Sequence, residues 1–338
     1  MTKLEIGVRS FSGCSSLEGG IFDGITINSV STESFKNCSK LDYIDISTLT
    51  LTQSLFEGCE KLHGDTAESN ILTIKKMSTL PTKTFMGCSS LTELAFTGTT
   101  NITTVGASCF EDCTSLLSLP AEITSTITII NTRSFYNCRT MENFTCGNSL
   151  KTLNSEAFYD CRKLKSFSVP SSATSLTSIG EKCFYDCFDL ESISFPKAIT
   201  IYQEAFHGCV SLETVDLPVV TTIYDQAFSG CAALTTFPDL PKLKYLYAEA
   251  FFGSGLEEVD WSGMTTTFSV LQDKVFGNCQ NLRTFKFHPT IGNTAIPPNF
   301  FIGCENITIY VPRDETANDE ANKPWGAENA TVIFGAYT

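Results

Sequence analysis

Histidine is scarce in this chain, with three residues among 338, and His63, His207 and His288 lie in unrelated sequence contexts. No paired C-x2-C knuckles accompany them, so the ligand spacing of a zinc site is missing. The G-x-S-x-G, P-loop and H-E-x-x-H patterns, which position nucleophiles, phosphates and catalytic metals, are missing too. These absences predict a protein that is not an enzyme and that carries no metal or cofactor.

Positive charge is also in short supply. The 23 Lys and Arg residues are outnumbered by 37 Asp and Glu residues, which gives a formal net charge of −14. A strongly acidic surface repels phosphate backbones, so nucleic acid and anionic lipid are poor candidate partners. No apolar run approaches the ~20 residues of a membrane span, and we expect no membrane insertion. The opening residues lack the apolar core of a signal peptide, so the protein either is not exported by that route or begins after a removed signal.

One short motif, by contrast, returns along the whole chain. The stretch "AFSGCAAL" at 227 has close copies such as "SFKNCSKL" at 34 and "AFHGCVSL" at 205. Aligned on the aromatic residue, the thirteen copies are Phe11, Phe35, Phe56, Phe85, Phe110, Phe135, Phe158, Phe184, Phe206, Phe228, Phe251, Phe276 and Phe301. An aliphatic residue lies five positions before each Phe, and Cys lies three positions after it in all copies but the eleventh, which has Ser254. The period averages about 24 residues, within the range of leucine-rich repeats.

The residue just before the Cys is Gly, Asn or Asp in every copy. These three residue types tolerate positive φ better than the others. Polar residues followed by Glu, as in "NSEAF" and "STESF", precede the Phe as they do at a helix start. We therefore interpret each motif as one short helical turn ended by a left-handed residue, with Phe and Cys directed into a core.

The segment after each motif alternates between apolar and polar residues. "LETVDLP" (212–218) and "LKSFSVP" (164–170) are typical of short strands with one buried face. One such repeat cannot bury its apolar side alone, but stacked repeats can. The sequence thus predicts an α/β leucine-rich-repeat solenoid of about 13 coils, right-handed, with a parallel sheet on the concave face and the short helical turns opposite.

The motif aliphatic-x4-Phe-x2-Cys-x2-Leu-x2-Ile-x-Leu-Pro resembles that of the BspA-like, or treponemal-type, leucine-rich repeat proteins. The resemblance covers about residues 6–312. It implies a cell-surface or secreted protein that adheres to a host or matrix protein, without shared catalytic residues. The chain then divides into a solenoid (1–312) and a C-terminal capping segment (313–338). In that segment we expect Trp325 and residues 332–334 to cover the last coil, with the acidic residues Asp314, Glu315, Asp319 and Glu320 in solvent.

The fifteen Cys residues could form disulfides, bind zinc or remain free. Side chains one coil apart run parallel rather than converging, which is poor disulfide geometry. We therefore favour small buried thiols that pack in a ladder.

The exposed row of the predicted strands is the candidate binding surface. Its residues are Tyr43, Asp45, Glu93, Asn143, Thr145, Ser166, Ser168, Ser192, Ser194, Thr214, Asp216, Glu258, Asp260, Thr284 and Lys286. This polar row suits a protein or glycan ligand, or it consists simply of solvated strand positions. Two functions stay open: an adhesion protein, or an intracellular or phage-type structural interaction module. The oligomeric state does not follow from the sequence.

Overall fold

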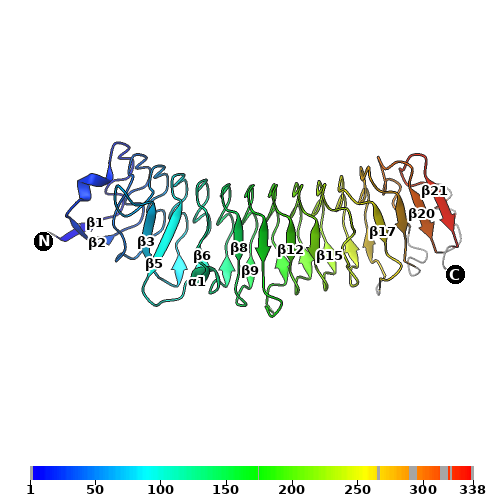
Figure 1. Cartoon of the computed structure of the whole chain (residues 1–338), viewed down its shortest axis with the longest axis horizontal. Helices are drawn as coiled ribbons and strands as arrows, with labels where there is room; N and C mark the ends of the chain where they lie inside the picture. Colours follow the sequence, from blue (N-terminus) through cyan, green and yellow to red (C-terminus); the bar gives the residue numbers. More distant parts are fainter. Residues whose placement is uncertain are drawn as a thin grey trace. The chain divides into compact units, whose positions relative to one another are not determined.

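The computed structural model describes residues 3–173, 175–264, 267–288, 295–312, 319 and 322–335. They form two compact units, Met1–Ser175 and Leu176–Thr338, each of which is a stack of repeat coils with parallel strands (Figure 1). The first unit contains the motifs from Phe11 to Phe158, and the second contains those from Phe184 to Phe301. The leucine-rich-repeat solenoid predicted from the motif spacing is confirmed within each unit.

The predicted alternating strands are present, and neighbouring ones pair in parallel. In the first unit they are β3 (Ile71–Lys75), β5 (Glu93–Thr97), β8 (Asn143–Thr145) and β10 (Ser166–Ser168). In the second they are β12 (Ser192–Ser194), β14 (Thr214–Asp216), β17 (Glu258–Asp260), β19 (Thr284–Lys286), β20 (Thr308–Val311) and β21 (Thr331–Phe334). β3 pairs with β5, β8 with β10, and β12 with β14, while β17, β19, β20 and β21 form one sheet. The middle residue of each three-residue strand points inward, as Phe167 and Ile193 do.

A second ladder of strands, which the sequence analysis did not predict, runs along the aliphatic column five residues before each Phe. In the first unit it comprises β1 (Lys3–Ile6), β2 (Thr26–Val30), β4 (Thr79–Leu80), β6 (Thr104–Val105), β7 (Ile129–Ile130) and β9 (Thr152–Leu153). In the second it comprises β11 (Ser178–Ile179), β13 (Thr200–Ile201), β15 (Thr222–Ile223), β16 (Tyr245–Leu246) and β18 (Val270–Leu271). All of these strands except β1 and β2 have two residues, too few to show an alternating pattern, which is why the sequence indicated only a buried aliphatic position.

The corner that carries each Phe is built from turns, although short helical turns were expected. Helix is limited among the named elements to a 3-10 turn, η1 (Gly19–Phe22), and one helical turn, α1 (Ala121–Thr124). The Gly, Asn or Asp before the Cys has positive φ in all thirteen copies, as predicted. A second left-handed residue lies two positions before the Phe in twelve copies, for example Ser108 (φ 53) and Lys182 (φ 52). Two positive φ values within five residues prevent a continuous helix. A type II turn, by contrast, requires a positive φ at its third residue.

Backbone hydrogen bonds at a corner alternate between local turns and the next coil. In the corner of Phe110, the N–H groups of Ser108, Phe110 and Asp112 donate to carbonyls of the following coil at 3.0, 2.8 and 2.9 Å. The N–H groups of Cys109, Glu111 and Cys113 donate instead to carbonyls three residues back in the same corner. Every backbone donor from Ser108 to Cys113 therefore has a partner, and half of these bonds join neighbouring coils.

The Phe column forms the aromatic core of each unit. Consecutive rings stack nearly parallel, with centroids 5.1 Å apart for Phe135 and Phe158 and 5.3 Å apart for Phe184 and Phe206. All of these side chains from Phe35 onward are fully buried. Offset stacks at this spacing add to the stabilisation that comes from burying the ring area.

At the C-terminal end, β21 adds one more parallel strand to the sheet beyond the thirteenth motif. It pairs with β20 in register, Thr308 opposite Thr331 and Val311 opposite Phe334. Trp325 is completely buried, and its carbonyl accepts a hydrogen bond from the N–H of Phe301 at 2.9 Å. Asp319 is also buried, so the expectation that it faces solvent was wrong. Asp314, Glu315 and Glu320 lie outside the described residues.

Phe184→Ala is expected to destabilise the protein by about 3–5 kcal/mol, the usual range for removing a buried aromatic ring and leaving a cavity. Urea unfolding at constant pH measures this difference. Substituting the partly exposed Phe252 in the same way serves as the control, because its ring lies outside the column. Equal unfolding midpoints for wild type and Phe184→Ala would contradict the core role of the ring.

Deletion of residues 313–338 is expected to lower the melting temperature and the solubility sharply, because we expect this segment to cap the solenoid. The deletion removes Trp325 and uncovers the edge of β20, with the buried side chains of Ile309 and Val311. Scanning calorimetry and light scattering measure the two effects. Deleting only residues 336–338, which leaves β21 intact, is the control. A monomeric truncated protein with an unchanged melting temperature would show that the segment is not a cap.

Candidate functional site

The strand residues of the predicted row point away from the core in both units. In the first unit, Glu93 lies on β5, Asn143 and Thr145 on β8, and Ser166 and Ser168 on β10. In the second, Ser192 and Ser194 lie on β12, Thr214 and Asp216 on β14, Glu258 and Asp260 on β17, and Thr284 and Lys286 on β19. All of these side chains are exposed or half-buried. The sequence thus located the outward strand positions of both units.

Pairing in register brings these outward side chains into contact along a sheet. Ser166 lies opposite Asn143 and donates a hydrogen bond to its Oδ1 at 2.9 Å. Ser194 lies opposite Asp216 and donates to its Oδ2 at 2.7 Å. Each outward face is therefore a hydrogen-bonded polar surface rather than a set of independent side chains.

Tyr43 and Asp45 lie outside the named strands and serve local structure. Tyr43 forms an isolated bridge with Gly64, and its hydroxyl contacts the carboxylate of Asp23 at 3.2 Å. Asp45 accepts hydrogen bonds from the backbone and the hydroxyl of Ser47 at 3.0 and 2.7 Å. The alternating pattern of residues 41–47 predicted that both residues lie on an outward strand face. In the structure this segment forms only an isolated bridge and no strand.

The charged end of the row is a compact ion-pair cluster. Lys286 Nζ lies 3.0 Å from Glu258 Oε1 and 2.9 Å from Asp260 Oδ2. The hydrogen bonds that Lys286 donates to Asp260 and Glu258 raise its pKa. Burial disfavours the charged form of Asp260, but hydrogen bonds from Ser262 and Lys286 outweigh burial and lower its pKa. Two carboxylates surround one ammonium group, so the cluster has a formal excess of negative charge.

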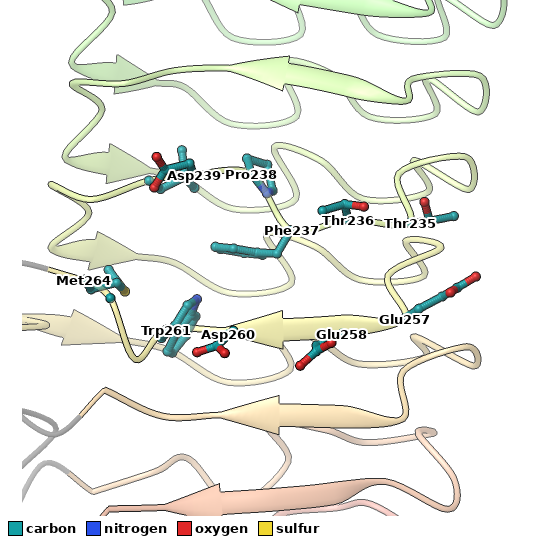
Figure 2. A pocket seen from close by; sticks show the side chains of 12 residues that line it. Thr235, Thr236, Phe237, Pro238, Asp239, Glu257, Glu258, Asp260, Trp261 and Met264 are labelled. Atoms are coloured by element: carbon teal, nitrogen blue, oxygen red, sulfur yellow. The ribbon is translucent and has the colours of Figure 1, made fainter. Parts of the chain in front are cut away.

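A hollow of about 500 Å³ lies beside this cluster, between residues 235–240 and 257–264 (Figure 2). Here the outward sheet of the second unit is interrupted, because residues 235–240 join β17 only through a single bridge between Thr236 and Glu258. Pro238 occupies the strand position that Asp216 and Asp260 occupy in other coils, and proline has no N–H to donate to a ladder. The missing strand opens a space that the neighbouring side chains only partly fill.

The hollow is lined by Thr235, Thr236, Phe237, Pro238, Asp239, Leu240, Glu257, Glu258, Asp260, Trp261, Gly263 and Met264. Sequence analysis placed only Glu258 and Asp260 in a site and missed the other residues. Two signals could have revealed them: the Pro238 inside a strand position, and the irregular eleventh motif "FFGSGL". That motif brings two coils together at Gly255, where a Cβ would lie 1.9 Å from the carbonyl oxygen of Ala232.

The cysteine column forms a ladder of thiol–carbonyl contacts. Ten of the ladder thiols donate a hydrogen bond to the carbonyl of the Phe in the preceding coil, as Cys113 Sγ does to Phe85 at 3.0 Å and Cys304 Sγ does to Phe276 at 3.0 Å. All fifteen cysteines are free in this structure, and Cys14 is the exposed one. Burial raises the pKa of Cys38 to about 11 and raises that of the more deeply buried Cys59 further.

Within the part of the chain that the structure describes, no group of three or more His, Cys, Asp or Glu side chains could hold a metal ion. Among the same residues, no helix is long and apolar enough to cross a membrane.

Stacked coils with two parallel strand ladders define a leucine-rich-repeat protein. The profile of the BspA type leucine rich repeat region (6 copies) matches residues 2–78, 78–200 and 199–318, so the chain belongs to this family. The family assignment agrees with the resemblance seen in the sequence.

Solved structures of bacterial leucine-rich repeat proteins are similar to this chain. The one from Bacteroides ovatus has 21% identity and a TM-score of 0.59, over 92% of this chain and 88% of that chain. A leucine rich cell surface protein from Faecalibacterium prausnitzii has 17% identity and a TM-score of 0.44, over 92% and 84%. The T. pallidum leucine rich repeat protein has 18% identity and a TM-score of 0.35, over 63% and 73%. A comparison with curated proteins found no match. The likeness to the Bacteroides protein supports the fold.

In the native protein, Ellman's reagent is expected to modify one thiol quickly, that of Cys14, and to modify all fifteen after denaturation without reductant. Burial slows the others because the reagent needs an accessible thiolate. Cys14→Ser should abolish the fast phase. Recovery of only one or two thiols from the denatured protein would contradict the free ladder.

Stability is expected to fall as the pH rises above about 8, where unfolded thiols begin to ionise. The unfolded thiols ionise near pH 8.5, whereas buried ladder thiols such as Cys38, Cys59 and Cys138 remain protonated in the folded state because burial raises their pKa values, to about 11 at Cys38. The unfolded state then binds fewer protons, so rising pH favours it by up to about 1.4 kcal/mol per pH unit for each thiol. Urea unfolding midpoints measured between pH 7 and 10 test this prediction. The stability of Cys138→Val should fall less steeply with pH, because this variant has one thiol fewer. Parallel curves for both proteins would contradict it.

Proposed function

We propose that this chain is a non-enzymatic binding protein that presents its outward strand faces to a protein or glycan ligand at a cell surface. The observation that carries the proposal is the polar, in-register face of paired strands, such as β12 with β14. Because a buried aromatic and thiol core holds the coils together, these outward positions can vary to suit a ligand. Membership of the BspA type leucine rich repeat family, a resemblance that implies adhesion to a host or matrix protein, supports the same role.

The chemistry of the face favours polar recognition. Ser192, Ser194, Thr214 and Asp216 offer hydrogen-bond donors and acceptors, and no large apolar side chain lies among these four. Interfaces of this kind depend on many hydrogen bonds and bridging waters rather than on a hydrophobic anchor. The ligand is therefore expected to be a polar protein surface or a glycan.

The proposal is tested by screening the full chain against glycans and extracellular matrix proteins, and then measuring affinity for each ligand found. Ser192→Arg with Thr214→Arg places two bulky cations on the exposed face of β12 and β14, and should weaken binding at least tenfold. Gln203→Arg with Val210→Arg adds the same charge at exposed positions off this face and should change affinity less than twofold. No ligand in either class, or equal losses for both variants, would contradict the proposal.

A further inference from the structure

The hollow beside β17 combines unpaired negative charge with an unpaired buried donor. Of its carboxylates, Glu258 and Asp260 share the ammonium group of Lys286. Asp239 and Glu257 are exposed, and within the described residues neither has an ion-pair partner. Figure 2 shows Asp239 on the upper segment at one end of the hollow and Glu257 on the lower segment at the other end, so the two carboxylates border the hollow from different coils and opposite ends.

Trp261 supplies the second, independent feature. Its side chain is 1% exposed, and its Nε1 has no hydrogen-bond partner among the described residues. In Figure 2 the indole rises from the end of β17 with its nitrogen at the tip, on the side of the hollow and Phe237. A buried N–H without an acceptor destabilises the protein, and a ligand that accepts its hydrogen bond removes that penalty.

Aromatic side chains form the floor between these polar groups. The rings of Phe237 and Trp261 meet edge to face with centroids 5.9 Å apart, and Phe237 is only half-buried. An aromatic face next to carboxylates is a favourable environment for a cationic side chain, since the ring quadrupole and the negative charges act in the same direction. The alkyl stem of such a side chain also packs well against Phe237 and Met264.

We infer that this hollow binds a lysine or arginine side chain of a partner protein, and that the adjacent main-chain carbonyl of the partner accepts the hydrogen bond of Trp261 Nε1. The cation pairs with Asp239, which lies at the same end of the hollow as Trp261, and Glu257 at the opposite end adds to the negative charge. A neutral sugar could satisfy the indole, but it would leave the two negative charges uncompensated. The inference deepens the proposed function by naming the partner's chemistry, and it rests on that function for the premise that the partner is a protein.

The test uses the ¹⁵N-labelled full chain, whose two Trp residues give two indole N–H signals. Trp261→Phe identifies the signal of Trp261, and the signal of the buried Trp325 serves as the internal reference. The probe is acetyl-Ala-Arg-Ala-amide, and its control is the same peptide with the neutral isostere citrulline. The arginine peptide should shift the Trp261 signal saturably and leave that of Trp325 in place, and the citrulline peptide should bind at least tenfold more weakly.

A matched pair of double variants separates specific binding from general attraction to an acidic protein. Asp239→Asn with Glu257→Gln should weaken arginine-peptide binding at least tenfold. Glu191→Gln with Glu213→Gln removes the same charge from exposed positions that correspond to Glu257 in two other coils, and should weaken it less than twofold. Melting temperatures of both variants should match that of the wild type.

Three results would overturn the inference: no shift of the Trp261 signal, equal losses in the two double variants, or a shift with chitotriose but not with the arginine peptide. The last result would make the hollow a sugar subsite. If the peptide fails while substitutions on β12 and β14 still abolish ligand binding, only this inference is wrong. If the peptide binds as expected but no ligand depends on those strands, the proposed role of the outward face is wrong instead.

Discussion

The alternating backbone hydrogen bonds of the Phe corner are the interaction on which the rest of each unit depends. Every second N–H of a corner, such as those of Ser108, Phe110 and Asp112, binds the next coil, and the N–H groups between them close local turns. This alternation requires positive φ two residues before and two residues after the Phe. Non-glycine residues reach that conformation at a cost of about 1–2 kcal/mol each, so the stacked core must stabilise every corner.

The core columns follow from that corner geometry. Because each corner repeats the same path, the Phe rings stack at 5.1–5.9 Å in the first unit, and ladder thiols such as that of Cys113 reach the carbonyl of the preceding Phe. Cysteine suits this position because it is small, apolar and a weak hydrogen-bond donor. Where Ser254 replaces it, the hydroxyl lies 3.3 Å from Cys279 Sγ, and the same coil has a shortened motif and borders the hollow.

Regular repetition made the fold and the outward strand positions predictable, because each column recurs often enough to separate signal from chance. The columns of Phe, Cys and left-handed residues required only the sequence. Features that depend on one coil were missed: the bridge at Tyr43, the buried Asp319, and the hollow opened by Pro238. The second strand ladder was missed for a different reason, since two residues give no periodicity. The lack of a hydrogen-bond partner for Trp261 Nε1 depends on which residues surround it in three dimensions, and the sequence does not give these neighbours.

Native-state hydrogen exchange of the corner amides tests the central claim most directly. If corners join the coils, the amides of Ser108, Phe110 and Asp112, whose bonds to the next coil are 2.8–3.0 Å long, should exchange only on global unfolding. These corner amides should then exchange as slowly as the amides of β8. The exchange rates of both groups should rise together as urea is added. Exchange of these three amides at the rate of the exposed residues 98–100, with β8 still protected, would show that the strands alone hold the stack.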